Sequence, residues 1–336
     1  MRLADIGGEF GFIERVKNFA RASQCDELDV SIGDDAAVFQ VPDGFDCVAT
    51  TDLLVEGIHF RRDWSSPYLI GWKSAAVNLS DIAAMGARPT FALIGLSIPE
   101  DVTVEFLDLF YDGFTACAGY GVTIIGGDTN GSQAGLTISI TQLGVVKRAE
   151  CLRRSGARAG DILAVTGTLG DSAMGLWLLQ TLGHMEAVRL WPGLVLRHLM
   201  PRPLVALGSF LSRNVNVNAA MDVSDGLCGD LAKLCQASGV GAILDIERLP
   251  VSDDLIRACS VNAKSSSEVA GTGGEDYELL LAISPDSINH VMFEMKQIGV
   301  ELTEIGSIVG GTQIEFRQKD GTVTSNTASG WDHFKI

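Results

Sequence analysis

Hydrophobic and polar positions along the chain follow two periods, which together predict an α/β protein. Phe12, Val16 and Phe19 fall on one face of a helix expected over residues 12–23. Further helices are expected at 67–85, 102–118, 173–182, 186–213, 227–237 and 287–299. Short apolar runs bounded by glycine, proline or aspartate predict buried strands. These strands are expected at 90–98, 122–125, 136–146, 161–166, 242–246, 277–283 and 302–308, with another ending near residue 222.

An acidic pattern between residues 31 and 52 gives the first chemical signal. Apolar runs at 36–41 and 47–49 are joined by a Pro-Asp-Gly turn, which predicts a β-hairpin or two neighbouring strands. Antiparallel pairing would bring the start of one strand beside the end of the other. Five polar residues would then converge at one end of a sheet: Asp34, Asp35, Thr50, Thr51 and Asp52. Like charges so placed repel one another unless a cation lies between them, so the pattern indicates either a cation site or a solvated loop.

The helix expected at 67–85 carries a carboxylate in an unusual place. Its second half is mostly small and apolar, which predicts burial, and Ser74, Asn78 and Asp81 share one face. Asp81 lies a full turn inside the helix, where a cap would not be placed. A buried carboxylate needs a partner or takes up a proton, so we expect a functional role for Asp81.

Glycines stand next to acids in three further segments, at 126–131, 222–226 and 271–276. Glycine lets a backbone approach a ligand closely and places the carboxylate beside it, although ordinary tight turns share this pattern. In the segment at 222–226, one of Ser224 and Asp225 would suffice to cap the following helix. Asp222 and whichever of the two is not the cap have no structural role in the pattern, so we expect them to be functional. A glycine loop at 167–172 resembles a phosphate cradle but lacks the P-loop ending, and Asp171 is better explained as a helix cap.

Length and charge narrow the class of protein. A chain of 336 residues, 46% hydrophobic and 20% charged, can bury two cores. A basic cluster at 147–154 fits a domain boundary, so the expected domains are residues 1–147 and 148–336. The net charge of −17 disfavours nucleic acid and anionic membranes as partners.

Cysteine usage and the N-terminal sequence predict a cytoplasmic protein. The seven cysteines are odd in number and form no CxxC pair, which is typical of reduced thiols. Residues 1–5 begin no secretory signal, and no apolar run approaches the roughly 20 residues that span a bilayer.

The recurring acids indicate a metal-dependent phosphate chemistry. Oxygen ligands without a histidine–cysteine set suit Mg²⁺ or Mn²⁺ better than zinc, and the EF-hand spacing of calcium loops is absent. Several such ions in an acidic chain imply a phosphorylated ligand, which Arg154 could hold bidentately. No Ser-His-Asp order supports covalent catalysis. A phosphoryl-transfer enzyme and a non-catalytic nucleotide or metal sensor both remain open.

Seven motifs, taken together, resemble those of the thiamine-monophosphate kinase family. They are Gly33-Asp34-Asp35-Ala36-Ala37, Thr51-Asp52 with Gly57-x-His59-Phe60, residues 76–86, Gly126-Gly127-Asp128-Thr129, Arg154-Ser155-Gly156, Asp222-Val223-Ser224-Asp225-Gly226 and residues 273–279. The family belongs to the superfamily of aminoimidazole-ribonucleotide synthetase. The resemblance implies a two-domain α/β (α+β) fold, in which the N-terminal sheet pairs with its copy in a homodimer. It also implies that ATP lies in the cleft between the N-terminal domain and the C-terminal α/β domain.

The same resemblance implies roles for individual residues. The Mg²⁺ ligands would be Asp35, Thr50, Thr51, Asp52, Asp81, Asp128, Asp222 and Asp225, of which Asp52, Asp128 and Asp222 are the expected catalytic residues. The ATP contacts would be Tyr111, Gly127, Asp128, Arg154 and Ser224. The substrate contacts, to thiamine monophosphate, would be His59, Glu275 and Trp331. The last position is often tyrosine in the family, and tryptophan keeps a ring face for stacking.

The activity implied is ATP-dependent phosphorylation of thiamine monophosphate to thiamine diphosphate, the last step of thiamine diphosphate biosynthesis. Such a reaction needs no general base, because a phosphate monoester has a second pKa near 6 and its attacking oxygen is already ionised at about pH 7. Clustered Mg²⁺ neutralises two polyanions and aligns them for in-line transfer. This explains a site that is rich in aspartate.

Other members of the superfamily are distinguished by features that the sequence lacks. The selenophosphate enzyme has a reactive cysteine followed closely by lysine near its N-terminus, whereas Cys25 here is followed by acids. The hydrogenase-maturation protein ends in a functional cysteine, and the printed sequence ends Phe334-Lys335-Ile336. The ribonucleotide synthetase differs in the segment corresponding to residues 53–60.

Overall fold

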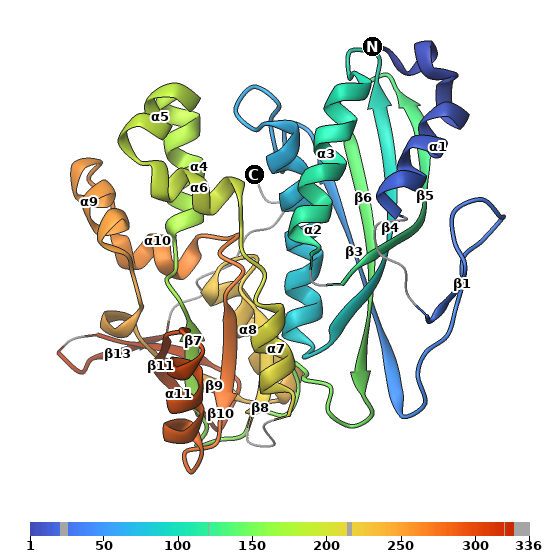
Figure 1. Cartoon of the computed structure of the whole chain (residues 1–336). Coiled ribbons are helices and arrows are strands. Elements are labelled where there is room, and N and C mark those ends of the chain that lie inside the picture. The colour runs from blue at the N-terminus through green and yellow to red at the C-terminus, as the bar shows by residue number, and fades with distance from the viewer. Residues whose placement is uncertain (21–25, 120, 214–216, 319, 326–336) are drawn as a thin grey trace. The chain divides into compact units, whose positions relative to one another are not determined.

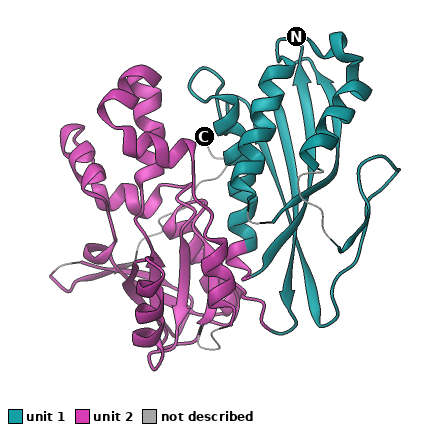
Figure 2. Ribbon diagram, in the orientation of Figure 1, with its two compact units in different colours: residues 1–82, 87–149 teal, residues 83–86, 150–336 magenta. Residues whose placement is uncertain are grey.

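The structure, a computed structural model of the chain, describes residues 1–20, 26–119, 121–213, 217–318 and 320–325. It divides into two compact units, residues 1–82 with 87–149 and residues 83–86 with 150–336 (Figure 2). The sequence placed a domain boundary at residue 147, close to where the second unit takes up the chain at residue 150. Within the described ranges, each helix is too short or too polar to cross a membrane.

The first unit is a four-stranded sheet with helices over one face (Figure 1). The strand order is β3-β6-β4-β5, in which β4 and β5 are parallel and the other two pairs are antiparallel. A separate small sheet pairs β1 with β2. In chain order the elements are η1 (Leu3–Ile6), α1 (Gly8–Ala20), β1 (Leu28–Val30), β2 (Val38–Phe39), β3 (Phe45–Val55), α2 (Pro67–Ala84), β4 (Arg88–Pro99), α3 (Val104–Cys117), β5 (Thr123–Ser132) and β6 (Thr137–Lys147).

Helices α2 and α3 pack closely because glycines remove side chains where the helices meet. A Cβ atom on Gly71 would lie 1.9 Å from the carbonyl oxygen of Phe110. A Cβ atom on Gly113 would lie equally close to the carbonyl oxygen of Tyr68, at 1.9 Å. Any larger side chain at either position would push the helices apart. This packing fixes α2 in place, and with it the predicted site residue Asp81.

The opposite face of the same sheet is partly covered by the segment around β2 and is exposed elsewhere in the described chain. Along β3 the side chains alternate: Ala49, Thr51 and Leu53 are exposed, whereas Leu54 is buried. Leu53 is 55% exposed, which is unusual for a leucine in the middle of a strand. The sheet therefore has one face under helices and one face available to another surface.

The second unit contains a seven-stranded sheet in the order β13-β12-β9-β11-β7-β10-β8. All its strand pairs are antiparallel except β12 with β9. Its elements are β7 (Ile162–Thr166), α4 (Asp171–Leu182), α5 (His184–Leu190), α6 (Pro192–Leu199), α7 (Val205–Leu211), β8 (Val217–Asp222), α8 (Leu227–Ser238), β9 (Gly241–Asp245), η2 (Ile246–Arg248), α9 (Asp253–Val261), α10 (Ser266–Thr272), β10 (Leu279–Ile283), α11 (Ile288–Gln297), β11 (Leu302–Val309), β12 (Ile314–Arg317) and β13 (Val323–Ser325).

Strand β10 explains why this sheet forms a core on both faces. Its five residues are apolar and fully buried, as expected for a central strand covered on both sides. Leu280 and Ala282 belong to the core that includes Leu231 and Leu234 of α8. The remaining residues, Leu279, Leu281 and Ile283, belong to the core that includes residues of α7 and α11.

Most predicted elements are confirmed, with a few exceptions. The β-hairpin or pair of neighbouring strands predicted between residues 36 and 49 is wrong, because β2 pairs with β1 and β3 pairs with β6 along its whole length. The glycine-rich segment at 126–131 is not a turn after a short strand, since β5 continues through it alongside β4. Helices α9 and α10 and strands β12 and β13 were not predicted. Strand β3 has its partner about ninety residues away in the sequence, where local pattern does not reach, whereas β12 and β13 pair with each other as a short local hairpin that the pattern missed.

Candidate active site

Three predicted metal ligands lie on the helix-covered face of the first sheet. The hydroxyl of Thr50 donates a hydrogen bond to Asp81 Oδ2 at 2.5 Å, so the carboxylate on α2 reaches down to β3. Asp52 follows two residues along the same strand and therefore points to the same face. Asp81 lies inside α2 and not at its start, as the sequence predicted. The structure thus brings Thr50, Asp52 and Asp81 to one face.

Two buried amide oxygens on α2 and β6 lack hydrogen-bond donors in the described structure. Gln142 stands opposite Thr50 in the β3–β6 pairing, and its Nε2 donates to the carbonyl oxygens of Phe91 and Leu143. Its Oε1 accepts no hydrogen bond, and neither does Oδ1 of Asn78. A buried carbonyl oxygen is stable when it meets a donor, a water molecule or a cation. Sequence reasoning marked Asn78 by its helical spacing and missed Gln142, whose only signal is a lone amide within an apolar strand.

Asp128 and Thr51 lie on the other face of this sheet, so Thr51 does not share a face with Thr50 and Asp52 as the predicted cluster required. Asp128 stands opposite Gly95, which stands opposite Ser139, whereas Asp52 stands opposite Ile140. Residues paired across strands share a face, so Asp52 and Asp128 point to opposite sides. They are also three strand spacings apart, roughly 14 Å. Within one sheet they cannot bind the same ion.

Glycine is required at position 127 for a packing reason that the sequence did not show. A Cβ atom there would lie 1.9 Å from the carbonyl oxygen of Ile94 on the neighbouring strand. The glycine was predicted to let the backbone approach a ligand, but the close approach in the structure is to β4. A nucleotide contact from Gly127 remains a prediction.

His59 is held in one tautomer by its own loop. Its Nδ1 lies 3.0 Å from the backbone nitrogen of Val55, which can only donate, so Nδ1 accepts and the neutral ring carries its proton on Nε2. The buried side chain of Lys73 donates to the carbonyl oxygen of His59 at 3.3 Å. Glu56 braces the same loop by accepting from Arg62 and from the backbone of Leu136. The imidazole is therefore positioned before any ligand arrives.

Asp34 and Asp35 are exposed and organise their own turn. Oδ1 of Asp34 accepts from the backbone nitrogen of Asp35 at 2.8 Å. The carboxylate of Asp35 is exposed, as a metal ligand at a surface would be. The predicted metal role of Asp35 remains a prediction.

In the second unit, two predicted motifs are bound to each other through their backbones. The backbone nitrogen of Glu275 donates to the carbonyl oxygen of Ser224 at 2.8 Å, and that of Tyr277 donates to Val223 at 2.9 Å. In return, Val223 donates to the carbonyl oxygen of Glu278 at 2.8 Å. This pairing places Asp222, Ser224, Asp225 and Glu275 in one short region.

The conformation of residues 222–226 is maintained by a residue that the sequence did not single out. Oδ2 of Asp230, which is fully buried, accepts from the backbone nitrogens of both Ser224 and Asp225 at 2.9 Å. The prediction that Ser224 or Asp225 caps the helix is wrong, since the N-cap of α8 is Gly226 and no side chain caps it. Burial raises the pKa of Asp230, while Lys233 opposes this shift. Lys233 also donates to Asp225, so a cation bound by Asp225 would compete with this ammonium group.

The segment that carries Glu275 is strained and anchored by buried acids. Glu275 and Tyr277 have φ values of 65° and 53°, a region that costs non-glycine residues about 1–3 kcal/mol each. Between them, Asp276 accepts from the backbone nitrogens of Gly170 and Ser172, and its burial raises its pKa to about 8. Such strain persists only where surrounding contacts enforce it, which is common at ligand sites.

The loop that contains Arg154 runs beside β8. The backbone nitrogen of Ala220 donates to the carbonyl oxygen of Arg153 at 2.8 Å, two residues before Asp222. The hydroxyl of Ser238 donates to the carbonyl oxygen of Arg154 at 3.0 Å. The guanidinium is on an exposed residue and its backbone is fixed, so it is available to an anion. Its contact with a phosphate remains a prediction.

Three remaining predictions concern the ATP contact Tyr111, the substrate contact Trp331 and the helix cap Asp171. Tyr111 is 2% exposed and packs against the rings of Phe12, Phe19 and Phe110, so the structure gives it a place in the core and no access to ATP. Trp331 lies outside the described residues. Asp171 is not a cap, because α4 begins after Gly170 and the buried carboxylate accepts from hydroxyl groups of Thr168 and Ser252.

The oxygen donors suit a hard cation, but they do not form a complete metal site within the described residues. No group of three or more acidic, histidine or cysteine side chains there is gathered so as to hold an ion. Thr50, Asp52, Asp81 and the unpaired oxygen of Gln142 nevertheless share one face, and such oxygens are the ligands that Mg²⁺ prefers. The donor chemistry therefore fits Mg²⁺, which would complete its coordination with water or phosphate oxygens.

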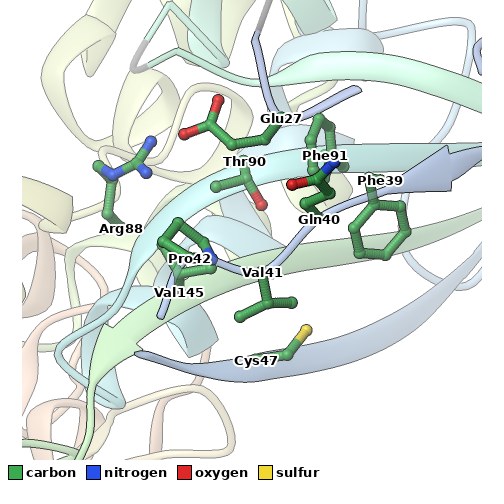
Figure 3. A pocket seen from close by; sticks show the side chains of 10 residues that line it. All are labelled: Glu27, Phe39, Gln40, Val41, Pro42, Cys47, Arg88, Thr90, Phe91 and Val145. Atoms are coloured by element: carbon green, nitrogen blue, oxygen red, sulfur yellow. The ribbon is translucent and has the colours of Figure 1, made fainter. Parts of the chain in front are cut away.

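A pocket elsewhere in the first unit is unrelated to these residues. It lies between the segment at 39–42 and strands β3, β4 and β6, where Phe39, Cys47 and Phe91 line it (Figure 3). The rings of Phe39 and Phe91 are 4.9 Å apart. None of the predicted site residues lines this pocket, and we assign it to packing between β2 and the sheet.

Comparisons with known proteins agree across the whole chain. Residues 33–146 match the family AIR synthase related protein, N-terminal domain, and residues 158–319 match the corresponding C-terminal domain. The chain is 37% identical to thiamine-monophosphate kinase of Salmonella typhimurium over 97% of its own length and 98% of the relative. The crystal structure of thiamine-monophosphate kinase from Stenotrophomonas maltophilia is similar with a TM-score of 0.83 at 36% identity, covering 94% of this chain and 98% of that one.

A further solved structure, AaThiL complexed with AMPPCP and TMP, has a TM-score of 0.78 at 36% identity and covers 99% of both chains. The similarity extends through both compact units. The chain belongs to the thiamine-monophosphate kinase family, within the proteins related to AIR synthase.

Proposed function

We propose that this protein transfers a phosphoryl group from ATP to thiamine monophosphate and so forms thiamine diphosphate, the last step of thiamine diphosphate biosynthesis. The observation that carries the proposal is the backbone pairing of Ser224 with Glu275, since it puts an expected nucleotide contact beside an expected substrate contact. The name of the similar structure, AaThiL complexed with AMPPCP and TMP, supports the same pair of ligands.

Within this proposal the residues of the chain bind and orient the two substrates. Arg154, Ser224 and the backbone at Gly127 would hold the nucleotide, and His59, Glu275 and Trp331 would hold thiamine monophosphate. The Nε2 proton of His59 would donate to an acceptor of the substrate, because Nδ1 is already engaged by Val55. No side chain needs to remove a proton, since the acceptor phosphate is largely ionised at about pH 7.

Magnesium would be bound by the oxygen donors already described. On the helix-covered face these are Thr50, Asp52 and Asp81, and elsewhere Asp35, Thr51, Asp128, Asp222 and Asp225. When bound, Mg²⁺ would neutralise phosphate charge and align the reacting groups. Asp52, Asp128 and Asp222 are the residues that we expect to be indispensable for turnover.

We also propose that a second copy of the chain covers the exposed face of the first sheet. Thr51 and Asp128 lie on this face, and Leu53 exposes 55% of its surface there. A homodimer built on the two sheets would bury these side chains and bring the second copy next to Asp128. A cytoplasmic location follows the same proposal, in keeping with the six free cysteines of the described residues.

The direct test is to incubate the purified protein with ATP, Mg²⁺ and thiamine monophosphate, and to measure thiamine diphosphate and ADP. We expect both products in equal amounts, with no product when thiamine replaces thiamine monophosphate. Asp52→Ala and Asp128→Ala should each abolish turnover and leave the fold intact. Asp43→Ala, in the turn before β3, is the matched control and should retain activity. Binding of ATP without any product would favour a sensor and overturn the proposal.

A further inference from the structure

The last turn of α6 carries two neighbouring residues that hold the segment around Glu275. Arg197 donates to Oε1 of Glu278 at 2.8 Å, and Nδ1 of His198 lies 3.0 Å from Oε2 of Glu275. The two acids are three residues apart, with the anchored Asp276 between them. The C-terminal end of α6 therefore contacts both ends of the strained segment at residues 275–278.

The contact of His198 with Glu275 has a defined direction. An ionised carboxylate only accepts hydrogen bonds, so Nδ1 of His198 must carry the proton that is shared with Glu275. The hydroxyl of Ser172 lies 3.2 Å from the same nitrogen and provides a second, longer contact. His198 is 3% exposed, so this donor is shielded from water and charge-assisted.

Glu275 gains orientation from this contact while it stays accessible. Its backbone is fixed by Ser224 and by its left-handed conformation. A glutamate side chain still has several rotatable bonds, and binding one carboxylate oxygen to a buried donor removes most of that freedom. Because 25% of the side chain is exposed, the oriented carboxylate can meet a ligand.

We propose that His198 is a positioning residue, which fixes the carboxylate of Glu275 for the amino group and positive charge of the aminopyrimidine–thiazolium part of thiamine monophosphate. The inference deepens the proposed function and rests on it. His198 itself would touch neither substrate. A fixed carboxylate binds such a group better than a mobile one, since the cost of ordering it has been met in the free protein.

The alternative is that His198 only fills the core between α4, α6 and residues 275–278. A core residue affects stability when it is replaced, but it does not change one substrate constant selectively. The test must therefore separate the affinity for thiamine monophosphate from the stability of the fold.

The experiment uses His198→Leu, His198→Asn and Leu199→Ala in the full chain. Leucine removes the donor at similar volume, asparagine keeps an N–H donor near the position of Nδ1, and Leu199→Ala loosens the same helix turn without touching Glu275. For His198→Leu we expect about a tenfold rise in KM for thiamine monophosphate, with KM for ATP unchanged. Calorimetric Kd for thiamine monophosphate should shift by the same factor. His198→Asn should stay within about threefold of the wild type, and Leu199→Ala should lower only Tm.

A double-mutant cycle with Glu275→Ala completes the test. If His198 acts through Glu275, then His198→Leu should cause no further loss of affinity once Glu275 is absent. Additive effects, equal loss of both substrates, or a rise in KM for Leu199→Ala would overturn the inference and leave the proposed function standing. A wild-type protein that forms no thiamine diphosphate would overturn both.

Discussion

Replacing Asp230 by alanine tests whether a buried carboxylate maintains the predicted nucleotide loop. Asp230 is fully buried, and one of its oxygens accepts from the backbone nitrogens of Ser224 and Asp225 at 2.9 Å each. Its other oxygen accepts from Lys233 at 2.8 Å. Alanine removes all three contacts and leaves two partly buried N–H groups without an acceptor.

The size of the effect follows from these contacts. Hydrogen bonds to charged groups contribute about 1.5–3 kcal/mol each, so the two backbone bonds together account for roughly 3–6 kcal/mol. Relaxation of the loop toward water recovers part of this, and we expect the free energy of unfolding to fall by about 3 kcal/mol. Asparagine keeps one oxygen for both N–H groups but loses the charge and the acceptor for Lys233, so Asp230→Asn should lose about 1–2 kcal/mol, less than Asp230→Ala.

Hydrogen exchange is the most direct assay, because it reports on the loop itself. The amides of Ser224 and Asp225 should exchange at least about tenfold faster in Asp230→Ala than in the wild type, with Asp230→Asn close to the wild type. KM for ATP should rise in parallel, since Ser224 is an expected nucleotide contact. Unchanged protection of these two amides in Asp230→Ala would refute the reasoning, whatever happens to activity.

Three further predictions concern pH, substrate affinity and the C-terminal segment. Burial raises the pKa of Asp276 to about 8, so between about pH 4 and 8 the folded protein keeps a proton that the unfolded chain loses. The free energy of unfolding should therefore fall as pH rises through this window, and Asp276→Asn should flatten the slope in denaturant titrations. Lys73→Met removes the donor to the carbonyl oxygen of His59 and should raise KM for thiamine monophosphate roughly threefold, with KM for ATP unchanged as the internal control. Trp331→Ala should raise KM for thiamine monophosphate about ten- to a hundredfold through lost stacking, and equal loss of ATP affinity would contradict this role.

The local pattern of hydrophobic and polar residues predicted an element correctly where the segment's own sequence determines its secondary structure. Strand β10 is an uninterrupted apolar run, and α2 starts at a Ser-Pro pair and stops before Gly86. The hairpin failed because a strand pattern does not identify its partner. Residues 45–55 pair with residues 137–147, far beyond any turn signal.

The sequence predicted which residues belong to the candidate site, but it did not predict on which face of the sheet each of them lies. Asp52 and Asp128 were both expected as Mg²⁺ ligands, but a strand presents alternate side chains to opposite faces. Only the register of four strands shows that the two aspartates lie on different sides of the sheet. Asp230 and His198 were not singled out because both lie inside predicted helices, whose pattern does not show which loop a side chain contacts.

Acidic residues in and near the predicted motifs serve two purposes in this chain, and burial separates them. Asp230, Asp276 and Glu278 are buried and bind backbone nitrogens, a hydroxyl or an arginine of their own unit. Asp35 and Asp128, in contrast, are exposed, and Asp225 is 38% exposed beside Lys233. The buried acids maintain the conformation of their own segments, and the accessible acids are the ones that a cation or a substrate can reach. Asp222 is buried, at 2% exposed, although it ends β8 directly before the loop that carries Ser224. Because Asp222 is a proposed Mg²⁺ ligand, we expect substitutions that loosen the core around β8 to lower the proposed activity.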